Sequence, residues 1–264
     1  MPELPEVEIL RRYFEEAALN KNISGCDFYD DLDKIFKSDR KTIQKALTGS
    51  SFTKTQRTGK YLFARIEKGS WLHLHFGMTG NLELFRGEAL PKYSRFVINF
   101  NDGDRLAFRD LRKFGVVQIV ESPDAYRKAQ KIGQDFLHID LSDFRAGLAN
   151  RKVAVKTALL DQKHFAGIGN WIADEMLFDA GIHPAESCVL LRDDDFRKLF
   201  EAGQKIIKAA IEADTHYGDF PKHFFVNYRK PKALHPDHPD SPVKRLIVGG
   251  RGTFIVPEKQ KLKS

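Results

Sequence analysis

The sequence predicts an α+β fold with two domains, and three observations support it. The first residues have the spacing of an amphipathic helix, residues 23–120 read mainly as short strands with polar turns, and the pattern becomes helical from residue 141 onward. With 264 residues, of which 42% are hydrophobic and 30% charged, the chain is long enough for two ordinary domains with real cores.

The leading stretch, Met1-Pro2-Glu3-Leu4-Pro5-Glu6-Val7, is typical of a helix start. Pro5 suits a first helical turn, and nearby glutamates complement the positive end of the helix dipole. An apolar stripe follows at helical spacing, made of Val7, Leu10, Phe14 and Ala18.

The same stretch has a second, chemical interpretation. If Met1 is removed, Pro2 presents a secondary amine directly followed by the carboxylate of Glu3, which places a nucleophile beside a proton carrier. A terminal amine titrates near ~8, against ~10.4 for lysine, so more of it is free base at neutral pH. Attack on a sugar C1′ would give an iminium that favours elimination at the neighbouring carbons. The short motif alone leaves both interpretations open.

The strand-rich region predicts a β-sandwich or barrel. Residues 61–66 and 71–76 alternate, with Leu72, Leu74 and Phe76 on one face of the second run. Asn101-Asp102-Gly103-Asp104 is a tight hairpin signal between strands at 96–100 and 105–108. Helical segments at 40–47 and after Pro123 interrupt the strands.

The second half predicts four helices, at residues 141–150, 153–162, 170–180 and 193–213. The composition changes near residues 132–139, where we place the domain boundary. The chain ends in a predicted hairpin, with strands at 243–248 and 253–256 around Gly249-Gly250-Arg251-Gly252.

The charge distribution favours a polyanionic partner. The net charge is +7, and residues 215–264 hold ten Lys or Arg against four Asp or Glu, although a solvated basic tail would look similar. Cys26 and Cys188 form no disulfide framework, and neither a signal peptide nor a membrane span is evident. A reducing, intracellular location is the expectation.

One turn in the helical half predicts a ligand site. Gly167-Ile168-Gly169-Asn170 joins two helices, so backbone amides could approach a phosphate at the start of the second helix. The alternative is a helical hairpin whose glycines only make the turn.

A set of short motifs occurs along nearly the full chain. The motifs are Pro2-Glu3-Leu4-Pro5-Glu6-Val7-Glu8, Gly59-Lys60-Tyr61-Leu62, Gly77-Met78-Thr79-Gly80, Asp110-Leu111-Arg112-Lys113-Phe114-Gly115, the helix-turn-helix stretch, Gly181-Ile182-His183-Pro184 and Gly250-Arg251-Gly252-Thr253. In this order, the set resembles the bacterial Fpg/Nei family of formamidopyrimidine-DNA glycosylases. The terminal Leu-Pro-Glu-Val sequence is closer to the Fpg branch than to the endonuclease VIII branch.

The resemblance implies catalytic roles. Pro2 would attack C1′ of a damaged nucleotide, and Glu3 would move protons during base loss and ring opening. Lys60 falls where the family has a catalytic lysine that contacts phosphate, rather than being only a surface lysine at a strand start. Asn170 and Arg251 match two phosphate clamps that flank the extruded nucleotide.

The resemblance also implies that Met78, Arg112 and Phe114 fill the void left by an extruded base. Extrusion costs a few kcal/mol, which an apolar wedge and a hydrogen-bonding side chain reduce. Phe114 would wedge the stack and Arg112 would read the orphaned base. Without the family, Met78 and Phe114 would be expected in the core and Arg112 on the surface.

The sequence departs from the family at the terminal finger. The family's two zinc-binding Cys-x-x-Cys pairs align with His235-Pro236-Asp237-His238 and Val256-Pro257-Glu258-Lys259, and the second supplies no nitrogen or sulfur ligand. We therefore expect no metal and no cofactor, and solvated histidines rather than a weak site of His235 and His238 with His216 or His223. A zincless finger would be held by packing of Leu246, Val248, Phe254 and Val256.

Two further departures concern loops. Residues 214–227 look short for the loop that covers 8-oxoguanine in the Fpg branch, which leaves the lesion preference open. Leu111 and Lys113 stand where a proline and an arginine are usual.

The resemblance thus predicts a β-sandwich domain with a leading helix (1–132), a helix-two-turn-helix domain (133–214) and a zincless β-hairpin finger (215–264). It implies a monomeric bifunctional DNA glycosylase and abasic-site lyase. Its partner would be double-stranded DNA with oxidised or abasic sites, in the nucleoid of a bacterial cytoplasm and away from membranes. The alternative is a catalytically idle protein that binds damaged or branched DNA.

Overall fold

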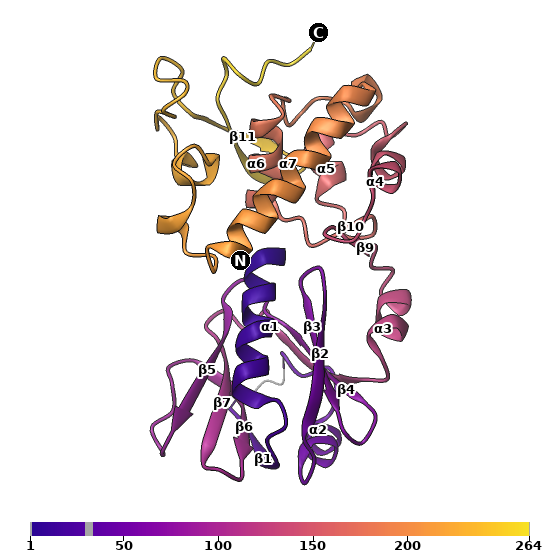
Figure 1. The fold of residues 1–264 in the computed structure, drawn as a ribbon, viewed down its shortest axis with the longest axis vertical. Helices are drawn as coiled ribbons and strands as arrows, with labels where there is room; N and C mark the ends of the chain where they lie inside the picture. Colours follow the sequence, from indigo (N-terminus) through magenta and orange to yellow (C-terminus); the bar gives the residue numbers. More distant parts are fainter. Residues whose placement is uncertain (1, 30–33, 264) are drawn as a thin grey trace. The chain divides into compact units, whose positions relative to one another are not determined.

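The structure is a computed structural model that describes residues 2–29 and 34–263. Its backbone contacts group into two compact units, which Figure 1 colours from indigo to yellow along the chain. The first unit comprises Pro2 and Glu6–Lys131, and the second comprises Glu3–Pro5 and the chain from Ile132 onward.

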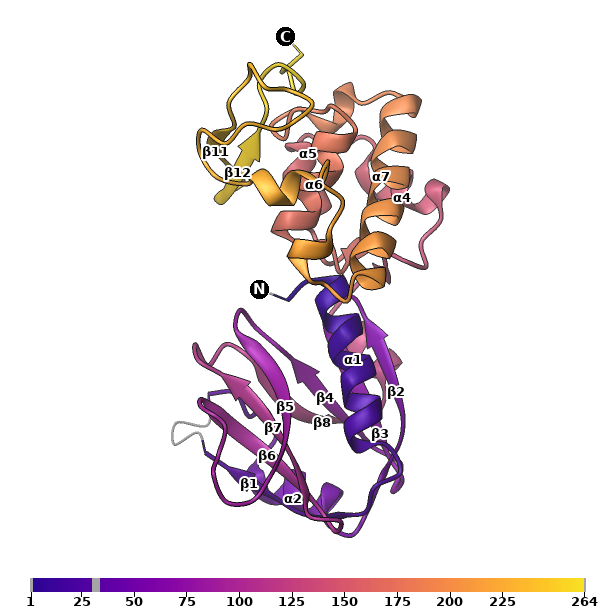
Figure 2. The same cartoon turned by 60° about the vertical axis from the view of Figure 1, so that its left-hand side comes forward.

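The first unit is a β-sandwich with a leading helix, as the sequence predicted. Helix α1 (Leu4–Ala18) lies alongside two four-stranded antiparallel sheets (Figure 2). One sheet has the order β1-β6-β7-β5, with strands Ile23–Phe28, Ser94–Phe100, Asp104–Asp110 and Gly80–Arg86. The other has the order β2-β3-β4-β8, with strands Phe52–Thr58, Tyr61–Ile66, Trp71–His75 and Val116–Val120. Two short helices complete the unit, α2 (Arg40–Leu47) and α3 (Pro123–Ala129).

The core of the sandwich joins α1 to both sheets. Val7, Phe14 and Ala18 of the predicted helical stripe are fully buried, and Leu10 packs against the same core from a half-buried position. Leu72 and Leu74 of β4 belong to this core as well. Burial of this apolar surface stabilises the unit by roughly 25 cal/mol for each Å² removed from water.

The second face of β4 is also buried. His73 packs against Phe63 and Tyr126, with ring centroids 5.0 and 4.4 Å away. Tyr126 belongs to α3 and packs against this face, which explains why the face of β4 that carries Trp71 and His73 is buried. Burial, together with the neighbouring His75, lowers the pKa of His73 to about 3, so this ring is neutral at physiological pH.

The second unit is helical and ends in a hairpin. Its helices are α4 (Leu141–Leu148), α5 (Val155–Leu159), α6 (Asn170–Asp179) and α7 (Asp193–Glu212). Two-residue strands β9 (Gln134–Asp135) and β10 (Phe165–Ala166) pair in parallel. Short 3₁₀ turns lie at η1 (Cys188–Leu190), η2 (Tyr217–Asp219) and η3 (Phe225–Tyr228). The hairpin consists of β11 (Lys244–Val248) and β12 (Arg251–Ile255).

Several predicted boundaries differ from the structure by one to three residues. Helix α5 begins at Val155 rather than at residue 153, because Ala154 is extended and forms a β-bridge with Ser187. Arg251 and Gly252 belong to strand β12, so that only Gly249 and Gly250 make the hairpin turn. No described helix is both long and apolar enough to cross a membrane, and both cysteines are free and buried.

Candidate functional site

Glu3 is held at the start of helix α6. Its side chain is almost fully buried, and its carboxylate oxygens accept hydrogen bonds from the backbone N–H groups of Trp171, at 3.0 Å, and Ile172, at 3.2 Å. The N-cap residue Gly169 has no side chain to cap these amides. Glu3 therefore supplies the negative charge that a helix N-terminus favours.

The glycine turn before α6 makes room for this carboxylate. A Cβ atom on Gly169 would lie 2.1 Å from Cδ of Glu3, so a larger residue at this position would displace the glutamate. The backbone N–H of Leu4 donates to the carbonyl of Gly167 at 3.2 Å, which fixes the next residue of the chain as well. The turn thus holds the backbone on the C-terminal side of Pro2 in place.

These contacts limit which amides at the helix start are available to the predicted phosphate site. The amides of Trp171 and Ile172, in the first turn of α6, bind the carboxylate of Glu3. The glycines do more than make a helical turn, since they admit Glu3 and Leu4. Any phosphate contact by Asn170 must therefore come from its side chain or its own backbone amide.

Lys60 lies in the hairpin loop between β2 and β3. Thr58 pairs with Tyr61, so Gly59 and Lys60 form a two-residue connection. Lys60 and Pro2 are both half-buried, and both belong to the first unit.

Met78, Arg112 and Phe114 lie on exposed loops of the first unit rather than in its core. Met78 is 39% exposed and Phe114 is 55% exposed, which is unusual for large apolar side chains. The guanidinium of Arg112 lies over the ring of Phe114, at 4.8 Å from the centroid. The structure therefore contradicts the alternative in which the two apolar residues are core residues.

Asp110 joins the loops that carry these three residues. Its carboxylate accepts hydrogen bonds from Oγ1 of Thr79 at 2.5 Å and from the backbone N–H of Arg112 at 3.2 Å and Gly115 at 2.7 Å. Asp110 is fully buried at the end of β7. A buried carboxylate with several donors is a rigid anchor, so the loops are fixed relative to each other.

Asn170 is connected to the strand that carries Arg251. Its side-chain amide nitrogen donates to the carbonyl of Gly252 at 3.0 Å, and its Oδ1 atom is buried without a hydrogen-bond partner among the described residues. Arg251 itself is exposed at the start of β12. The two predicted phosphate-binding residues therefore lie on segments of the second unit that are joined by a hydrogen bond.

A buried lysine supports the same connection. Nζ of Lys156 donates to Oδ1 of Asp174 at 2.6 Å and to Oγ1 of Thr253 at 2.7 Å. The other oxygen of Asp174 pairs with Arg229 at 2.7 Å. Burial lowers the pKa of Lys156 against the opposing effect of Asp174, and the ion pair links α5, α6 and the hairpin.

Both units resemble parts of known proteins. Residues 1–117 match the formamidopyrimidine-DNA glycosylase N-terminal domain, and residues 133–220 match the formamidopyrimidine-DNA glycosylase H2TH domain. A formamidopyrimidine-DNA glycosylase of Ligilactobacillus salivarius is 33% identical, with 100% of each chain covered. One from Arabidopsis thaliana is 32% identical over 99% of this chain and 71% of its own length.

The chain belongs to the formamidopyrimidine-DNA glycosylase family.

Solved structures of the family share the fold. The Lactococcus lactis formamidopyrimidine-DNA glycosylase, non-covalently bound to DNA that contains an AP site, has a TM-score of 0.89 at 27% identity, covering 98% of this chain and 99% of that one. A MutM structure in complex with DNA containing carbocyclic 8-oxo-G has a TM-score of 0.88 at 26% identity, covering 98% and 100%.

The finger of this family member is built around a buried histidine. His235 has no exposed surface, which corrects the expectation of a solvated loop residue, whereas His216 and His223 are exposed and His238 is half-buried. Nδ1 of His235 accepts from the N–H of Asp237 at 3.2 Å, so Nε2 carries the proton and donates to the carbonyl of His223 at 3.0 Å. Both ring nitrogens are therefore engaged in hydrogen bonds.

An apolar cluster lies next to His235 in the finger. It consists of Phe178, Phe225, Val243 and Val256, with Phe254 and Tyr228 packed against it. The ring of His235 lies 4.6 Å from that of Phe178, centroid to centroid. Of the four residues expected to pack in the finger, Val256 and Val248 are buried, and Phe254 and Leu246 are half-buried.

Buried phenylalanines anchor the segment 214–227, although most of its other residues are exposed. Phe220 and Phe224 are buried, and Trp171 contacts both Phe220 and Tyr217. Glu175 of α6 accepts hydrogen bonds from the N–H groups of Phe225 and Val226, at 2.7 and 2.6 Å.

Sequence reasoning missed Asp110, Lys156 and Glu175 as organising residues. Lys156 stands between Val155 and an apolar run that begins at Ala158, so a charged residue on a buried helix face was a detectable signal. Asp110 is part of one of the sequence motifs, but its role in joining two loops depends on a contact with Thr79, which is distant in sequence.

Proposed function

We propose that this protein is a bifunctional DNA glycosylase and abasic-site lyase that excises oxidised bases in base excision repair. Its membership of the formamidopyrimidine-DNA glycosylase family supports the reaction class. Its substrates would be duplex DNA with formamidopyrimidine, 8-oxoguanine or other oxidised bases, and abasic sites. It would act as a monomer in the bacterial nucleoid.

The observation that carries this proposal is that two backbone N–H groups in the first turn of α6 donate hydrogen bonds to the carboxylate of Glu3. A buried carboxylate held by two backbone amides fixes the residue that directly follows Pro2. An enzyme that uses its terminal amine needs such a fixed terminus, because small displacements of reacting groups cost large factors in rate.

In the proposed reaction, the nitrogen of Pro2 forms a bond to C1′ while the bond from C1′ to the base breaks. The departing base takes up a proton, and Glu3 moves protons during base loss and ring opening. The resulting iminium acidifies the adjacent carbon, so elimination releases the 3′ phosphate and a second elimination releases the 5′ phosphate. Water finally hydrolyses the Schiff base and frees Pro2.

The remaining site residues would hold the DNA. Lys60, Asn170 and Arg251 would contact phosphates around the extruded nucleotide. Met78, Arg112 and Phe114 would fill the space that this nucleotide leaves, and the exposure of Met78 and Phe114 supports this role. The net charge of +7 agrees with an anionic partner.

The test is cleavage of a panel of duplexes and single strands, each with one oxidised base or abasic site, at controlled salt. We expect base release and strand cleavage on at least one oxidised lesion, and cleavage of abasic sites. Salt-sensitive binding of damaged DNA without cleavage of any substrate would contradict the proposal and favour the idle DNA-binding protein.

A further inference from the structure

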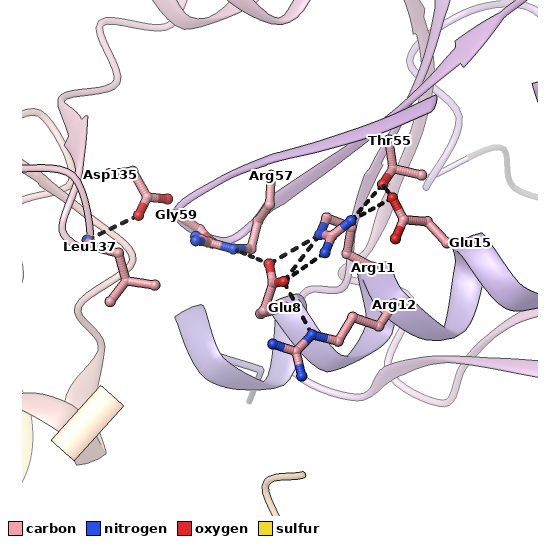
Figure 3. A network of polar contacts seen from close by, with 9 residues as sticks. All are labelled: Glu8, Arg11, Arg12, Glu15, Thr55, Arg57, Gly59, Asp135 and Leu137. Carbon is pink, nitrogen blue, oxygen red and sulfur yellow. Dashed lines mark hydrogen bonds and ion pairs between the residues drawn. The ribbon is translucent and has the colours of Figure 1, made fainter. Parts of the chain in front are cut away.

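Glu8 of helix α1 is the centre of an ion-pair network in the first unit (Figure 3). Its carboxylate accepts from Nη2 of Arg11 at 2.8 Å and from Nε of Arg57 at 3.0 Å, and Arg12 approaches to 3.4 Å. Burial opposes ionisation, but the bonds from Arg11 and Arg57 outweigh it and lower the pKa of Glu8. The carboxylate is therefore charged at neutral pH.

Arg11 and Arg57 each contact further groups besides Glu8, and these groups differ. Arg11 donates to Oγ1 of Thr55 at 3.0 Å and pairs with Glu15 at 2.5 Å, farther along α1. Arg57 instead donates from Nη1 to the carbonyl of Gly59 at 3.1 Å (Figure 3). The side chain of Arg57 is only 5% exposed, so it is held in this position by its surroundings.

The carbonyl of Gly59 belongs to the same planar peptide unit as the backbone nitrogen of Lys60. Fixing that oxygen fixes the plane, and with it the direction in which the chain enters Lys60. Gly59 has φ of +57°, a conformation that a side chain would strain, and it lies in a two-residue loop. Arg57 therefore helps to set the direction in which the backbone enters Lys60.

We propose that Arg57 is a positioning residue for Lys60. Its guanidinium bridges the carboxylate of Glu8 on α1 and the carbonyl of Gly59, so the lysine loop is fixed to the helix that follows Pro2. This inference rests on the proposed function for its catalytic consequence, but its structural content does not depend on catalysis.

The first test compares the same substitution, Arg to Lys, at the two arginines that pair with the carboxylate of Glu8. In Arg57→Lys the charge near Glu8 remains, but one ammonium lacks the planar fork that reaches both acceptors. Single-turnover base excision should fall ~10- to 100-fold, as expected for a displaced catalytic group. The matched control Arg11→Lys also weakens a pair with Glu8 but leaves the Gly59 contact intact, so its rate should stay within roughly twofold of the wild type.

A double-mutant cycle shows whether the effect passes through Lys60. If Arg57 acts by positioning the lysine, Arg57→Lys should cost little in a Lys60→Ala background. The inference would be overturned if the rate losses of the two single variants multiplied in the double variant. It would also be overturned if Arg11→Lys lost as much activity as Arg57→Lys.

Hydrogen exchange of the DNA-free protein separates this inference from the proposed function. Amides of residues 59–62 should exchange faster in Arg57→Lys than in the wild type or Arg11→Lys, because the loop opens locally. Equal exchange in all three proteins would overturn the positioning role whatever the activity. A wild type that cleaves no lesion would refute the proposed function alone.

Discussion

The carboxylate of Glu3 accepts a hydrogen bond from the backbone N–H of Trp171 at 3.0 Å. A residue next to the chain start thereby caps a helix that begins at Asn170. This contact explains why residue 169 is a glycine, since a Cβ atom there would collide with the glutamate. It also fixes the backbone beside the proposed nucleophile.

Replacing this cap should affect both stability and base release. Glu3→Gln keeps one acceptor oxygen but removes the negative charge at the helix N-terminus, so the free energy of unfolding should fall by about 1 kcal/mol. Loss of the proton carrier should slow base release ~100-fold or more in single-turnover assays. Urea unfolding measures the first effect.

Asp39→Asn is the control for this prediction. Asp39 caps α2 in the first unit by accepting from the N–H of Thr42, so its replacement weakens a helix cap far along the chain from Glu3. Stability should fall while base release persists. Undiminished base release by Glu3→Gln would refute the proton-carrier role.

Asp110→Asn should reduce cleavage of duplex substrates more than cleavage of single-stranded substrates. In the variant an NH2 donor replaces one of the two buried oxygens that accept from Thr79, Arg112 and Gly115, so the loops that carry Met78 and Phe114 should loosen. A void exists only where a base leaves a stacked duplex, so cleavage of duplex lesions should fall ~10-fold or more, beyond any loss on single strands. Equal losses on both substrates would indicate that Asp110 acts only through general stability.

Glu175 should make the stability pH-dependent. Burial raises its pKa from 4.5 to about 7, against the opposing bonds from the Phe225 and Val226 N–H groups. Because the folded state then binds the proton more tightly than the unfolded state, this group's contribution is fully present below about pH 4.5 and is lost as the pH rises through 7. The loss amounts to about 3 kcal/mol.

The measurement is the free energy of unfolding of the wild type minus that of Glu175→Gln, from pH 4.5 to 8. The difference should decrease with rising pH, since glutamine does not titrate. An increase would mean that the two backbone hydrogen bonds outweigh burial and hold the pKa of Glu175 below its ordinary value.

The finger should be stable without metal. Because His235 uses both ring nitrogens in hydrogen bonds and lies among Phe178 and Tyr228, a chelator should leave the thermal midpoint unchanged. His235→Ala should instead lower the free energy of unfolding by about 2 kcal/mol, through the cavity and the lost hydrogen bonds. Stoichiometric zinc in metal analysis of purified protein would contradict this account.

Patterns local in sequence predicted most of the fold. The stripe of Val7, Phe14 and Ala18 predicted helix α1, and alternation predicted β3 and β4. Helix α2 was predicted at its observed bounds, Arg40–Leu47. These elements were predictable because the period of their apolar residues reflects which side they bury.

Contacts between distant segments could not be predicted. The burial of His73 depends on Tyr126 of α3, and the extended start of α5 depends on Ser187. At the start of α6, where the sequence predicted a phosphate site, the amides of Trp171 and Ile172 bind Glu3, more than 160 residues away in sequence. The roles assigned to Pro2, Lys60, Asn170 and Arg251 stay predictions.

The most direct test of the central claim is to locate the covalent adduct. Borohydride reduction during reaction with an abasic or oxidised duplex should trap the protein on DNA, and mass spectrometry should find the sugar on the terminal peptide, at the nitrogen of Pro2. A protein with a chemically blocked terminus should trap nothing. An adduct on Lys60 or another lysine, or undiminished trapping by the blocked protein, would contradict the account.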